Sequence, residues 1–231
     1  MFMINPFFNQ QESYNPNLCF GLYHFDGSIG HTLFSDNSPA NRTLQGDGAL
    51  LWDWAKFGVS SVRFPDDIYD KAVCHSCYDV GNSDFTFELF FLFNFDFGQV
   101  FKGLIANADD PSTKDWQLYL NGQKIEFGIN LQNDGWQTIQ HQNNALSGAW
   151  NYVKVLRKNG VIKIGLNGVE SSNAINAGNQ SVSYLANKFV VGGMYYSSPW
   201  NGLYPNGYID ELRLNKQAID DWSVPTAPFA M

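Results

Sequence analysis

Three side chains of kinds that bind zinc fall within four residues of this sequence, in Cys74-His75-Ser76-Cys77. Thiolate and imidazole groups ligate zinc, and two cysteines in this spacing can chelate an ion from a tight turn. A structural zinc site needs four ligands, however, and the only other cysteine is Cys19. We therefore expect these cysteines to pack in a loop as small apolar groups, with a disulfide and a metal shared across subunits as the alternatives.

Paired carboxylates that could hydrolyse a glycosidic bond are the second chemistry to consider. Such a pair must lie roughly 5–10 Å apart. The stretch FTFELFFLFNFDF (85–97) offers Glu88 and Asp96, but their spacing in a strand puts them about 26 Å apart. The sequence contains no G-x-S-x-G, no H-E-x-x-H and no Walker loop, and its four histidines stand in no triad context. We expect no enzymatic activity.

Aromatic side chains in expected loops form a third candidate site. A ring face can hold the apolar face of a sugar while amides and carboxylates bind its hydroxyl groups; alternatively, such rings cap the core or lie in a subunit interface. The stretch GGMYYSSPWNGLYPNG (192–207) is the best candidate for a contact loop, because it combines large rings with Gly and Pro hinges. The loop rings are Trp52, Trp54, Trp136, Tyr195, Tyr196, Trp200 and Tyr204, with Asn133, Asp134, Asn201 and Asn206 as polar neighbours. The residues expected to contact a glycan or a partner are Trp136, Tyr195, Tyr196, Trp200 and Tyr204.

The elements that position these residues are expected to be β-strands. Aromatic residues make up 16% of the chain, and this excess favours strands over helices. The stretch FTFELFFLFNF (85–95) is apolar on both faces, as in a strand that is covered on both sides. In VIKIGLN (161–167), Ile162, Ile164 and Leu166 point one way, so one face of that strand is expected to be dry. Further strands are expected at 116–120, 124–130, 151–157, 59–64, 189–193 and 207–214.

Turn signals separate several of these strands. The pairs Asn121-Gly122, Asn159-Gly160 and Asn167-Gly168 can adopt the positive φ angles of tight hairpin turns. No stretch combines a sustained helical period with caps, although KQAIDDW (216–222) could form one short turn. Many short strands, with turns about every 8–12 residues, predict an all-β protein. The expected architecture is a two-sheet antiparallel β-sandwich, or jelly roll.

One carboxylate is hard to reconcile with this pattern. In NGYIDELRLN (206–215), a period of two places Asp210 on the same strand face as Leu212 and Leu214, with Ile209 on the opposite face. A half-buried carboxylate in an apolar row needs partners, and backbone N–H groups of a neighbouring loop could supply them.

Composition bounds the class of protein. At 231 residues and 26.0 kDa, the chain fits one all-β domain. Its net charge of −8 would repel a nucleic acid, and no basic cluster offsets that charge locally. We expect neither a signal peptide nor a membrane span, because the chain lacks a basic start and any run of about 18 apolar residues. Three cysteines indicate folding in a reducing compartment.

Eight segments of the chain stand in a distinctive order and spacing. They are LYHFDG (22–27), FSDNS (34–38), KFGVSSVRF (56–64), DFTFELFF (84–91), WQLYLNG (116–122), LSGAWNYVKVLRKNGVIKIGLNGVE (146–170), FVVGG (189–193) and NGYIDELRL (206–214). Together they resemble the laminin G-like, concanavalin A-type jelly-roll domain that recurs in bacteriophage virion proteins. The resemblance covers about residues 20–229 and implies two antiparallel sheets that bind carbohydrate or protein more often than they do chemistry. The chain departs from the family pattern between Arg63 and Asp84, where a longer segment replaces a brief loop.

Composition sets the ends of the domain, and the resemblance implies a metal site. We expect an N-terminal arm at 1–18, which is rich in Asn, Gln and Pro, a laminin G-like jelly-roll domain at 19–222, and an extended C-terminal tail at 223–231, where two prolines lie in nine residues. Members of this family commonly carry an acidic residue at the start of the last strand, and several hold calcium at the rim of the sandwich. On this resemblance Asp26 and Asp210 are candidate calcium ligands, with backbone carbonyls and waters completing the coordination. The alternative for Asp210 is the set of backbone N–H groups described above.

These observations lead to a functional expectation. We expect a non-enzymatic structural protein of a bacteriophage particle, made in the host cytoplasm and located in the virion. It would be either a tail fibre-associated adhesin for a host surface glycan or a capsid decoration protein that contacts other virion proteins and its own copies. By analogy a homo-oligomer is expected, with a trimer preferred. A cellular carbohydrate-binding or adhesion module is the alternative, and a glycoside hydrolase of concanavalin A-like fold is a remote one.

Overall fold

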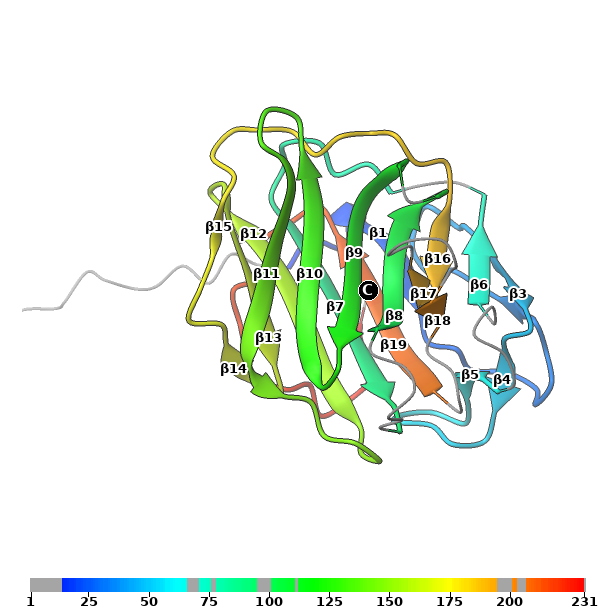
Figure 1. Cartoon of the computed structure of the whole chain (residues 1–231). Helices are drawn as coiled ribbons and strands as arrows, with labels where there is room; N and C mark the ends of the chain where they lie inside the picture. The colour runs from blue at the N-terminus through cyan, green and yellow to red at the C-terminus, as the bar shows by residue number, and fades with distance from the viewer. Residues whose placement is uncertain are drawn as a thin grey trace, which may run out of the picture.

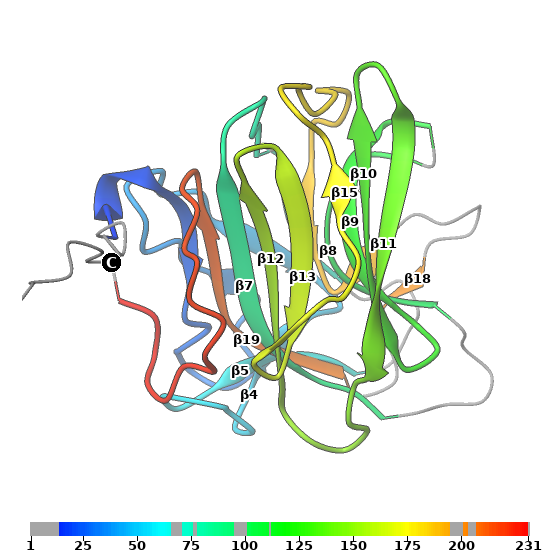
Figure 2. The same cartoon turned by 90° about the vertical axis from the view of Figure 1, so that its left-hand side faces the viewer.

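The computed structural model describes residues 14–65, 71–75, 78–94, 101–110, 112–194, 201–202 and 207–230. Within them the chain forms two large antiparallel sheets packed face to face, and Figure 2 shows the two layers. Among the described residues the one helical element is a single 3-10 turn, η1 (Pro16–Leu18), and no helix is long and apolar enough to cross a membrane. The predicted all-β sandwich is therefore confirmed, whereas 216–222 contains bends and no helical turn.

The first sheet, sheet A, has β7 and β19 near its centre. Its strand order is β14-β13-β12-β7-β19-β5-β4, with β1 paired to β19 and β15 paired to β13. The strands are β1 (Cys19–Tyr23), β4 (Leu50–Trp52), β5 (Ser61–Phe64), β7 (Phe85–Leu92), β12 (Asn151–Lys158), β13 (Val161–Leu166), β14 (Val169–Glu170), β15 (Ile175–Asn176) and β19 (Gly207–Asn215). All eight residues of β7 are buried, so the predicted interior strand is confirmed.

The second sheet, sheet B, faces the viewer in Figure 1 and follows the order β11-β10-β9-β8-β16-β6-β3-β2. Its strands are β2 (Leu33–Phe34), β3 (Leu44–Asp47), β6 (Lys71–Cys74), β8 (Phe101–Ala108), β9 (Lys114–Asn121), β10 (Lys124–Leu131), β11 (Gly135–Asn144) and β16 (Phe189–Val191). Strand β6 lies in the segment that departs from the family pattern. It pairs with β16 on one side and β3 on the other, so this segment contributes an internal strand of the sheet.

Alternation along each strand builds the core between the two sheets. On β7, Phe87, Leu89 and Phe91 point into the core, while Phe90 points to the outer side of sheet A. Sheet B contributes Trp116 from the opposite side, and its ring lies 4.6 Å from that of Phe87, centroid to centroid. These contacts fix the sheets face to face and leave the two outer faces to carry other residues.

Two of the three predicted Asn-Gly turns have the expected backbone. The φ angles are 51° and 76° at Asn159-Gly160 and 50° and 84° at Asn167-Gly168. At the third position Asn121 is still the last residue of β9, and the turn consists of Gly122 and Gln123. Only Gly122 has a positive φ there, of 60°, so that prediction is one residue out of register.

Strand β19 changes its neighbour halfway along, and a β-bulge marks the change. Its first part pairs with β5 and its last part with β1, while β7 runs along the other edge. The pairing with β7 shifts register just after Asp210, and Glu211 has a positive φ of 50°. The extra residue puts Ile209 and Leu212 in the core together and leaves Asp210 opposite Phe90 on the outer side. The prediction that Asp210 shares a face with Leu212 is therefore wrong, because a strict period of two does not anticipate a bulge.

The C-terminal segment, residues 216–230, crosses the outer face of sheet A, where Figure 2 shows it in red. Phe229 packs with Phe90 in a second, smaller hydrophobic cluster on this face. The backbone N–H of Phe229 donates to Glu211 Oε2 at 2.8 Å. The expected tail at 223–231 has no regular secondary structure as far as residue 230, but its end is packed against the sheet.

Candidate functional site

Trp136 stands on the outer face of sheet B, near the start of edge strand β11. Its benzo ring fills the space above Gly128 of β10, where a Cβ would come within 2.1 Å of Trp136 Cζ2. The ammonium of Lys114, on β9, lies 4.4 Å from the centroid of the indole. The ring is thus half-buried and held against the sheet by its neighbours. The other predicted contact rings, Tyr195, Tyr196, Trp200 and Tyr204, lie outside the described residues.

A row of polar side chains crosses the same face beside Trp136. Glu126 of β10 pairs with Tyr119 of β9 on one side and with Gln140 of β11 on the other, so the three side chains lie in line. Glu126 accepts hydrogen bonds from the Tyr119 hydroxyl and from Asn121 and Gln140, the latter two at 3.3 Å. We name Tyr119, Glu126 and Gln140 the polar row. Phenol, carboxylate and amide groups supply both donors and acceptors for a ligand.

A short two-stranded ribbon borders the polar row on its other side. It consists of β17 (Gly193–Met194) and β18 (Asn201–Gly202). The ribbon lies against β8, because a Cβ at Gly103 would come within 2.2 Å of the Gly193 carbonyl carbon. Figure 2 shows β18 on the outer side of sheet B. The ribbon residues of the predicted contact loop, 193–194 and 201–202, therefore lie on the same face as Trp136, whereas Gly207 already belongs to β19 of sheet A.

The remaining part of this outer face carries a hollow of ≈ 270 Å³ over β3, β6, β16 and β8. Val73 and Val190 contribute its apolar surface, and Lys71, His75 and Lys188 supply groups that are or can become positively charged. Lys71 is paired with Asp47 at 2.7 Å. The hollow thus adds a second group of polar contacts to the face that carries Trp136.

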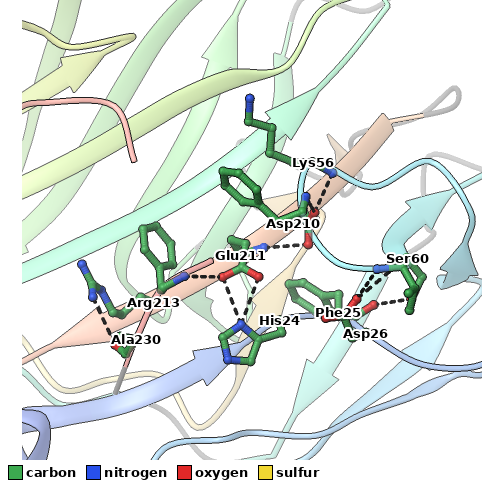
Figure 3. A network of polar contacts seen from close by, with 12 residues as sticks. His24, Phe25, Asp26, Lys56, Ser60, Asp210, Glu211, Arg213 and Ala230 are labelled. Atoms are coloured by element: carbon green, nitrogen blue, oxygen red, sulfur yellow. Dashed lines mark hydrogen bonds and ion pairs between the residues drawn. The ribbon is translucent and has the colours of Figure 1, made fainter. Parts of the chain in front are cut away.

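Asp210, one of the two predicted calcium ligands, is fully buried and binds backbone N–H groups (Figure 3). Its Oδ2 accepts hydrogen bonds from the N–H groups of Lys56 at 2.7 Å and Phe57 at 3.0 Å, and Oδ1 accepts one from Glu211 at 2.9 Å. Two of these partners, Lys56 and Phe57, are N–H donors of a neighbouring loop, which the sequence left open as the alternative to a metal. Burial raises the pKa of Asp210 to about 8, although the N–H donors act in the opposite direction.

Asp26, the other predicted ligand, binds the far end of the same loop, residues 53–60 between β4 and β5. Its Oδ1 accepts hydrogen bonds from the N–H groups of Val59 at 2.7 Å and Ser60 at 3.3 Å. Gly58 allows this approach, because its φ is +65° and a Cβ there would lie 2.2 Å from Asp26 Oδ1. Both carboxylates therefore act on the backbone of one loop.

The described residues contain no group of three or more His, Cys, Asp or Glu side chains placed to hold a metal ion. Asp26 does line a polar hollow of ≈ 490 Å³ at the rim, together with His24 and His31. His24 is bound to Glu211, with Nδ1 at 3.0 Å from each carboxylate oxygen, and this hydrogen bond raises the pKa of His24. The role of Asp26 and Asp210 as calcium ligands stays a prediction.

The Cys74-His75-Ser76-Cys77 motif begins on β6, where successive side chains point to opposite faces. Cys74 is a buried thiol in the core, whereas His75 is exposed on the outer face of sheet B. Ser76 and Cys77 lie outside the described residues. Cys74 thus packs as a small apolar group, but in a strand rather than in the expected loop.

Glu88, which the sequence offers as a carboxylate for glycoside hydrolysis, is buried on the outer side of sheet A. Its Oε1 accepts a hydrogen bond from the Tyr152 hydroxyl at 2.5 Å and lies 3.3 Å from Lys154 Nζ. Its Oε2 accepts two hydrogen bonds from Arg213, at 3.0 and 2.6 Å. The proposed partner carboxylate, Asp96, lies outside the described residues. Glu88 is thus engaged in a buried ion-pair network.

Other polar and aromatic residues near the predicted sites have structural partners. Trp52 ends β4 and Trp54 lies in the loop that follows it, so both belong to the layer of sheet A. The ring of Trp54 is 5.2 Å from that of Tyr208, centroid to centroid, and half of its surface is exposed. Asp134, expected to bind a hydroxyl beside Trp136, accepts a hydrogen bond from Gln180 at 2.6 Å.

Sequence reasoning did not single out Lys114, Gly128 or the polar row. A glycine inside a strand pattern is a sequence signal for close approach of another group, and Gly128 stands in KIEFGIN. Alternation within β9 and β10 would then have placed Glu126 and Gly128 on one face. The cross-strand partners could not be known without the register.

Comparison with known proteins adds a family and a set of similar folds. The family model described as Laminin_G_3, concanavalin A-like lectin/glucanases superfamily, matches residues 66–224. The binding domain of botulinum neurotoxin serotype G superposes with a TM-score of 0.64 at 12% identity, covering 89% of this chain and 49% of that one. The serotype D binding domain gives a TM-score of 0.66 at 12% identity, covering 88% and 49%. The binding domain of Paraclostridial mosquitocidal protein 1 gives 0.66 at 12% identity, covering 89% and 50%.

These likenesses concern the fold. The chain spans about half the length of the three solved structures. No curated protein matches the sequence.

Proposed function

Because the chain belongs to the concanavalin A-like lectin/glucanases superfamily, we propose that it is a non-enzymatic binding module that holds a glycan on the outer face of sheet B. One observation carries the proposal. Trp136 and the polar row lie side by side on a face that also carries the β17–β18 ribbon of the 192–207 loop. An indole next to phenol, carboxylate and amide groups matches the mixed apolar and hydroxylated surface of a sugar ring.

The solved structures with a similar fold support binding over catalysis. They are binding domains of two neurotoxins and of a mosquitocidal protein. The ion pairs of Glu88 support the same choice, because they occupy the carboxylate that sequence reasoning considered for catalysis.

A glycan can stack on Trp136 only if it displaces the side chain of Lys114. Its ammonium covers part of the Trp136 indole, and burial lowers the pKa of Lys114. A cation–π contact at a partly exposed position contributes about 0.5–1 kcal/mol. A sugar ring can therefore displace the lysine at small cost and take its place over the indole.

Glycan-array binding tests the proposal. Trp136→Ala is expected to lower binding about tenfold or more, a loss of about 1.4 kcal/mol. Trp54→Ala is the matched control, because it removes another partly exposed indole from the opposite layer and is expected to leave binding unchanged. Circular dichroism shows whether each variant is folded. Full binding by a folded Trp136→Ala variant would overturn the site, and a wild-type protein that binds no glycan would overturn the glycan role.

We infer further that this module is a structural component of a bacteriophage particle, as an adhesin or a decoration protein. The eight segments that resemble virion jelly-roll domains support this role. Its partners would then be other virion proteins and its own copies, in a homo-oligomer for which a trimer is preferred by analogy. Co-sedimentation with purified particles is expected, and its loss on deleting residues 1–18 would favour decoration. Glycan binding without any association with particles would favour the cellular adhesion module instead.

A further inference from the structure

A groove of ≈ 370 Å³ lies on the opposite side of the molecule, on the outer face of sheet A. It forms where the C-terminal segment passes β12, β13 and β14. Lys163 and Val161 point to this face because Ile162 and Ile164, between and beside them on β13, point into the core. The residues that matter for its chemistry are Val161, Trp222, Lys158, Asp220, Lys163 and Glu170. The volume is within the range of about 300–1,000 Å³ that is usual for small-molecule sites.

Trp222 supplies an aromatic surface in this groove. Its ring lies over Gly165 of β13, where a Cβ would come within 2.5 Å of Trp222 Cε3. The backbone beside the ring is held in place, because Lys154 Nζ donates a hydrogen bond to the Asp221 carbonyl at 2.6 Å. Trp222 is half-buried, so the position of the ring is set by packing while part of its surface faces the groove. Trp222 on Gly165 repeats, on sheet A, the relationship of Trp136 to Gly128 on sheet B.

Two ion pairs supply the polar side of the groove. Lys158 lies 3.1 Å from Asp220, and Lys163 is paired with Glu170. The paired side chains are between 37% and 49% exposed, and surface pairs of this kind contribute only about 0–1 kcal/mol. Their donors and acceptors can therefore turn to a ligand at small cost.

The charges also select the class of ligand. The groove holds two cationic and two anionic side chains, which sum to zero, and the whole chain carries −8. An anionic ligand gains nothing from the paired lysines and is repelled by the overall charge. An apolar helix would remove water from both ion pairs and offer these four charged groups no hydrogen bonds in return. A neutral sugar presents an apolar face to the indole and hydroxyl groups to both kinds of charge.

We propose that the groove lined by Trp222, Lys163 and Glu170 is a second saccharide-binding site, for a neutral oligosaccharide. It does not depend on the site around Trp136. If both sites bind, a single molecule has two glycan sites on opposite sheets and can link two chains of a polysaccharide, with an avidity that exceeds either single affinity.

Fluorine NMR can observe the two sites separately in the full-length chain. The protein is labelled with 5-fluorotryptophan, and the signals of its seven tryptophans are assigned from single Trp→Phe variants. Maltotriose, cellotriose and tri-N-acetylchitotriose serve as neutral probes. Trigalacturonic acid serves as the acidic probe. The Trp222 signal is expected to shift saturably with at least one neutral probe and not with the acidic one.

A variant that leaves the indole in place tests the polar side of the groove. Lys163→Met keeps most of the side-chain volume but removes a donor and unbalances Glu170, and it is expected to weaken the Trp222 response about fivefold or more. Lys124→Met, which removes a partly exposed lysine from sheet B, is the control and should leave the Trp222 response unchanged. Equal weakening by both variants would contradict a role for Lys163 in binding.

The possible outcomes separate this proposal from the one for sheet B. A shift of the Trp222 signal alone supports the second site and contradicts the first, and a shift of the Trp136 signal alone does the reverse. A Trp222 signal that responds to the acidic sugar but to no neutral one overturns the neutral class. A signal that moves only with an uncharged peptide, acetyl-Gly-Ser-Phe-Leu-amide, would show a peptide groove and overturn the saccharide. No shift with any probe overturns the second site.

Discussion

Asp210 and Asp26 hold the middle and the C-terminal end of one loop, residues 53–60, against the rim of the sandwich (Figure 3). Asp210 can reach the loop because the bulge at Glu211 turns it out of the core row, at the point where β19 exchanges β5 for β1. The carboxylate that looks misplaced in the sequence therefore has a physical task. It satisfies backbone donors in the loop that joins β4 to β5.

Removing the Asp210 carboxylate is expected to destabilise the protein markedly. Asp210→Ala leaves the N–H groups of Lys56, Phe57 and Glu211 without their acceptor, and each buried unsatisfied group costs about 1–3 kcal/mol. We expect a loss of at least about 2 kcal/mol in the free energy of unfolding, measured by urea denaturation. Asp26→Ala is the comparison, and because Asp26 is exposed it should cost less. A larger loss for Asp26→Ala than for Asp210→Ala would contradict this account of the loop.

Stability is expected to fall as pH rises from mildly acidic to mildly basic. Burial raises the pKa of Asp210 to about 8 and that of Asp115, a buried residue of β9, to about 6, and the hydrogen bond with Glu211 raises the pKa of His24. Each group binds its proton more tightly in the folded protein than in the unfolded chain, so its contribution is present at low pH and lost as pH rises through the folded pKa.

For Asp115 that loss is complete above about pH 6, and for Asp210 above about pH 8. Urea midpoints between about pH 5 and pH 8.5 should therefore decline. Asp210→Asn cannot ionise, so the decline of its midpoint should be flatter above about pH 6. A wild-type midpoint that rises across this interval would show that the signs are wrong.

Calcium removal is expected to leave the fold unchanged, because Asp26 and Asp210 bind backbone N–H groups. Thermal midpoints in EDTA and in excess calcium chloride should agree within about 1 °C, far less than the shift of about 2–4 °C that 1 kcal/mol causes in a chain of this size. A rise of several degrees with calcium that Asp26→Asn abolishes would instead establish the calcium site predicted from the family resemblance.

Glu88 is expected to be the most sensitive charged residue of sheet A. Although burial acts to raise its pKa, the charges of Arg213 and Lys154 hold the pKa of Glu88 below its ordinary value. Glu88→Gln leaves these two cations without a counter-charge under the C-terminal segment, and breaking a buried pair costs about 3–5 kcal/mol. Tyr152→Phe is the control, because it removes one hydrogen bond and no charge and should cost about 1 kcal/mol. Chemical denaturation that gives Glu88→Gln the smaller loss would refute the role of the network.

Local chemistry was enough to predict much of the fold. Strand β7 is recognisable because its own residues are apolar on both faces. The turns at Asn159-Gly160 and Asn167-Gly168 are recognisable because these residue pairs favour positive φ angles. Both features follow from local sequence and need no knowledge of distant residues. Strand β11 is different, because its ten residues, GWQTIQHQNN, carry few apolar side chains, of which Ile139 reaches the core. Its identity as a strand comes from pairing with β10, which the sequence alone does not reveal. The bulge at Glu211 has the same origin in distant pairing.

Three glycines inside strands show how much of the candidate site can be predicted from the sequence. A Cβ at Gly103, Gly128 or Gly165 would collide with a group that lies on the outer face of its sheet. The colliding groups are Gly193, Trp136 and Trp222 respectively. Each glycine is a visible signal of close approach. The group that approaches lies about 8 to 90 residues away in the sequence. The pattern can therefore predict that another group packs on the glycine, but not which group it is.

Gly128→Ala is expected to move Trp136 without unfolding the protein. The new Cβ would lie 2.1 Å from Trp136 Cζ2, so the ring has to leave its place above β10. Alanine in place of a strand glycine also restricts the unfolded chain and returns about 0.5–1 kcal/mol, which offsets part of the lost packing. The urea midpoint should therefore change little, while tryptophan fluorescence shifts to the red and glycan binding falls. Lys114→Ala is the control, because it uncovers the same indole without moving it, and binding should persist. Unchanged glycan binding in a Gly128→Ala variant with displaced fluorescence would show that the position of Trp136 does not matter for the ligand.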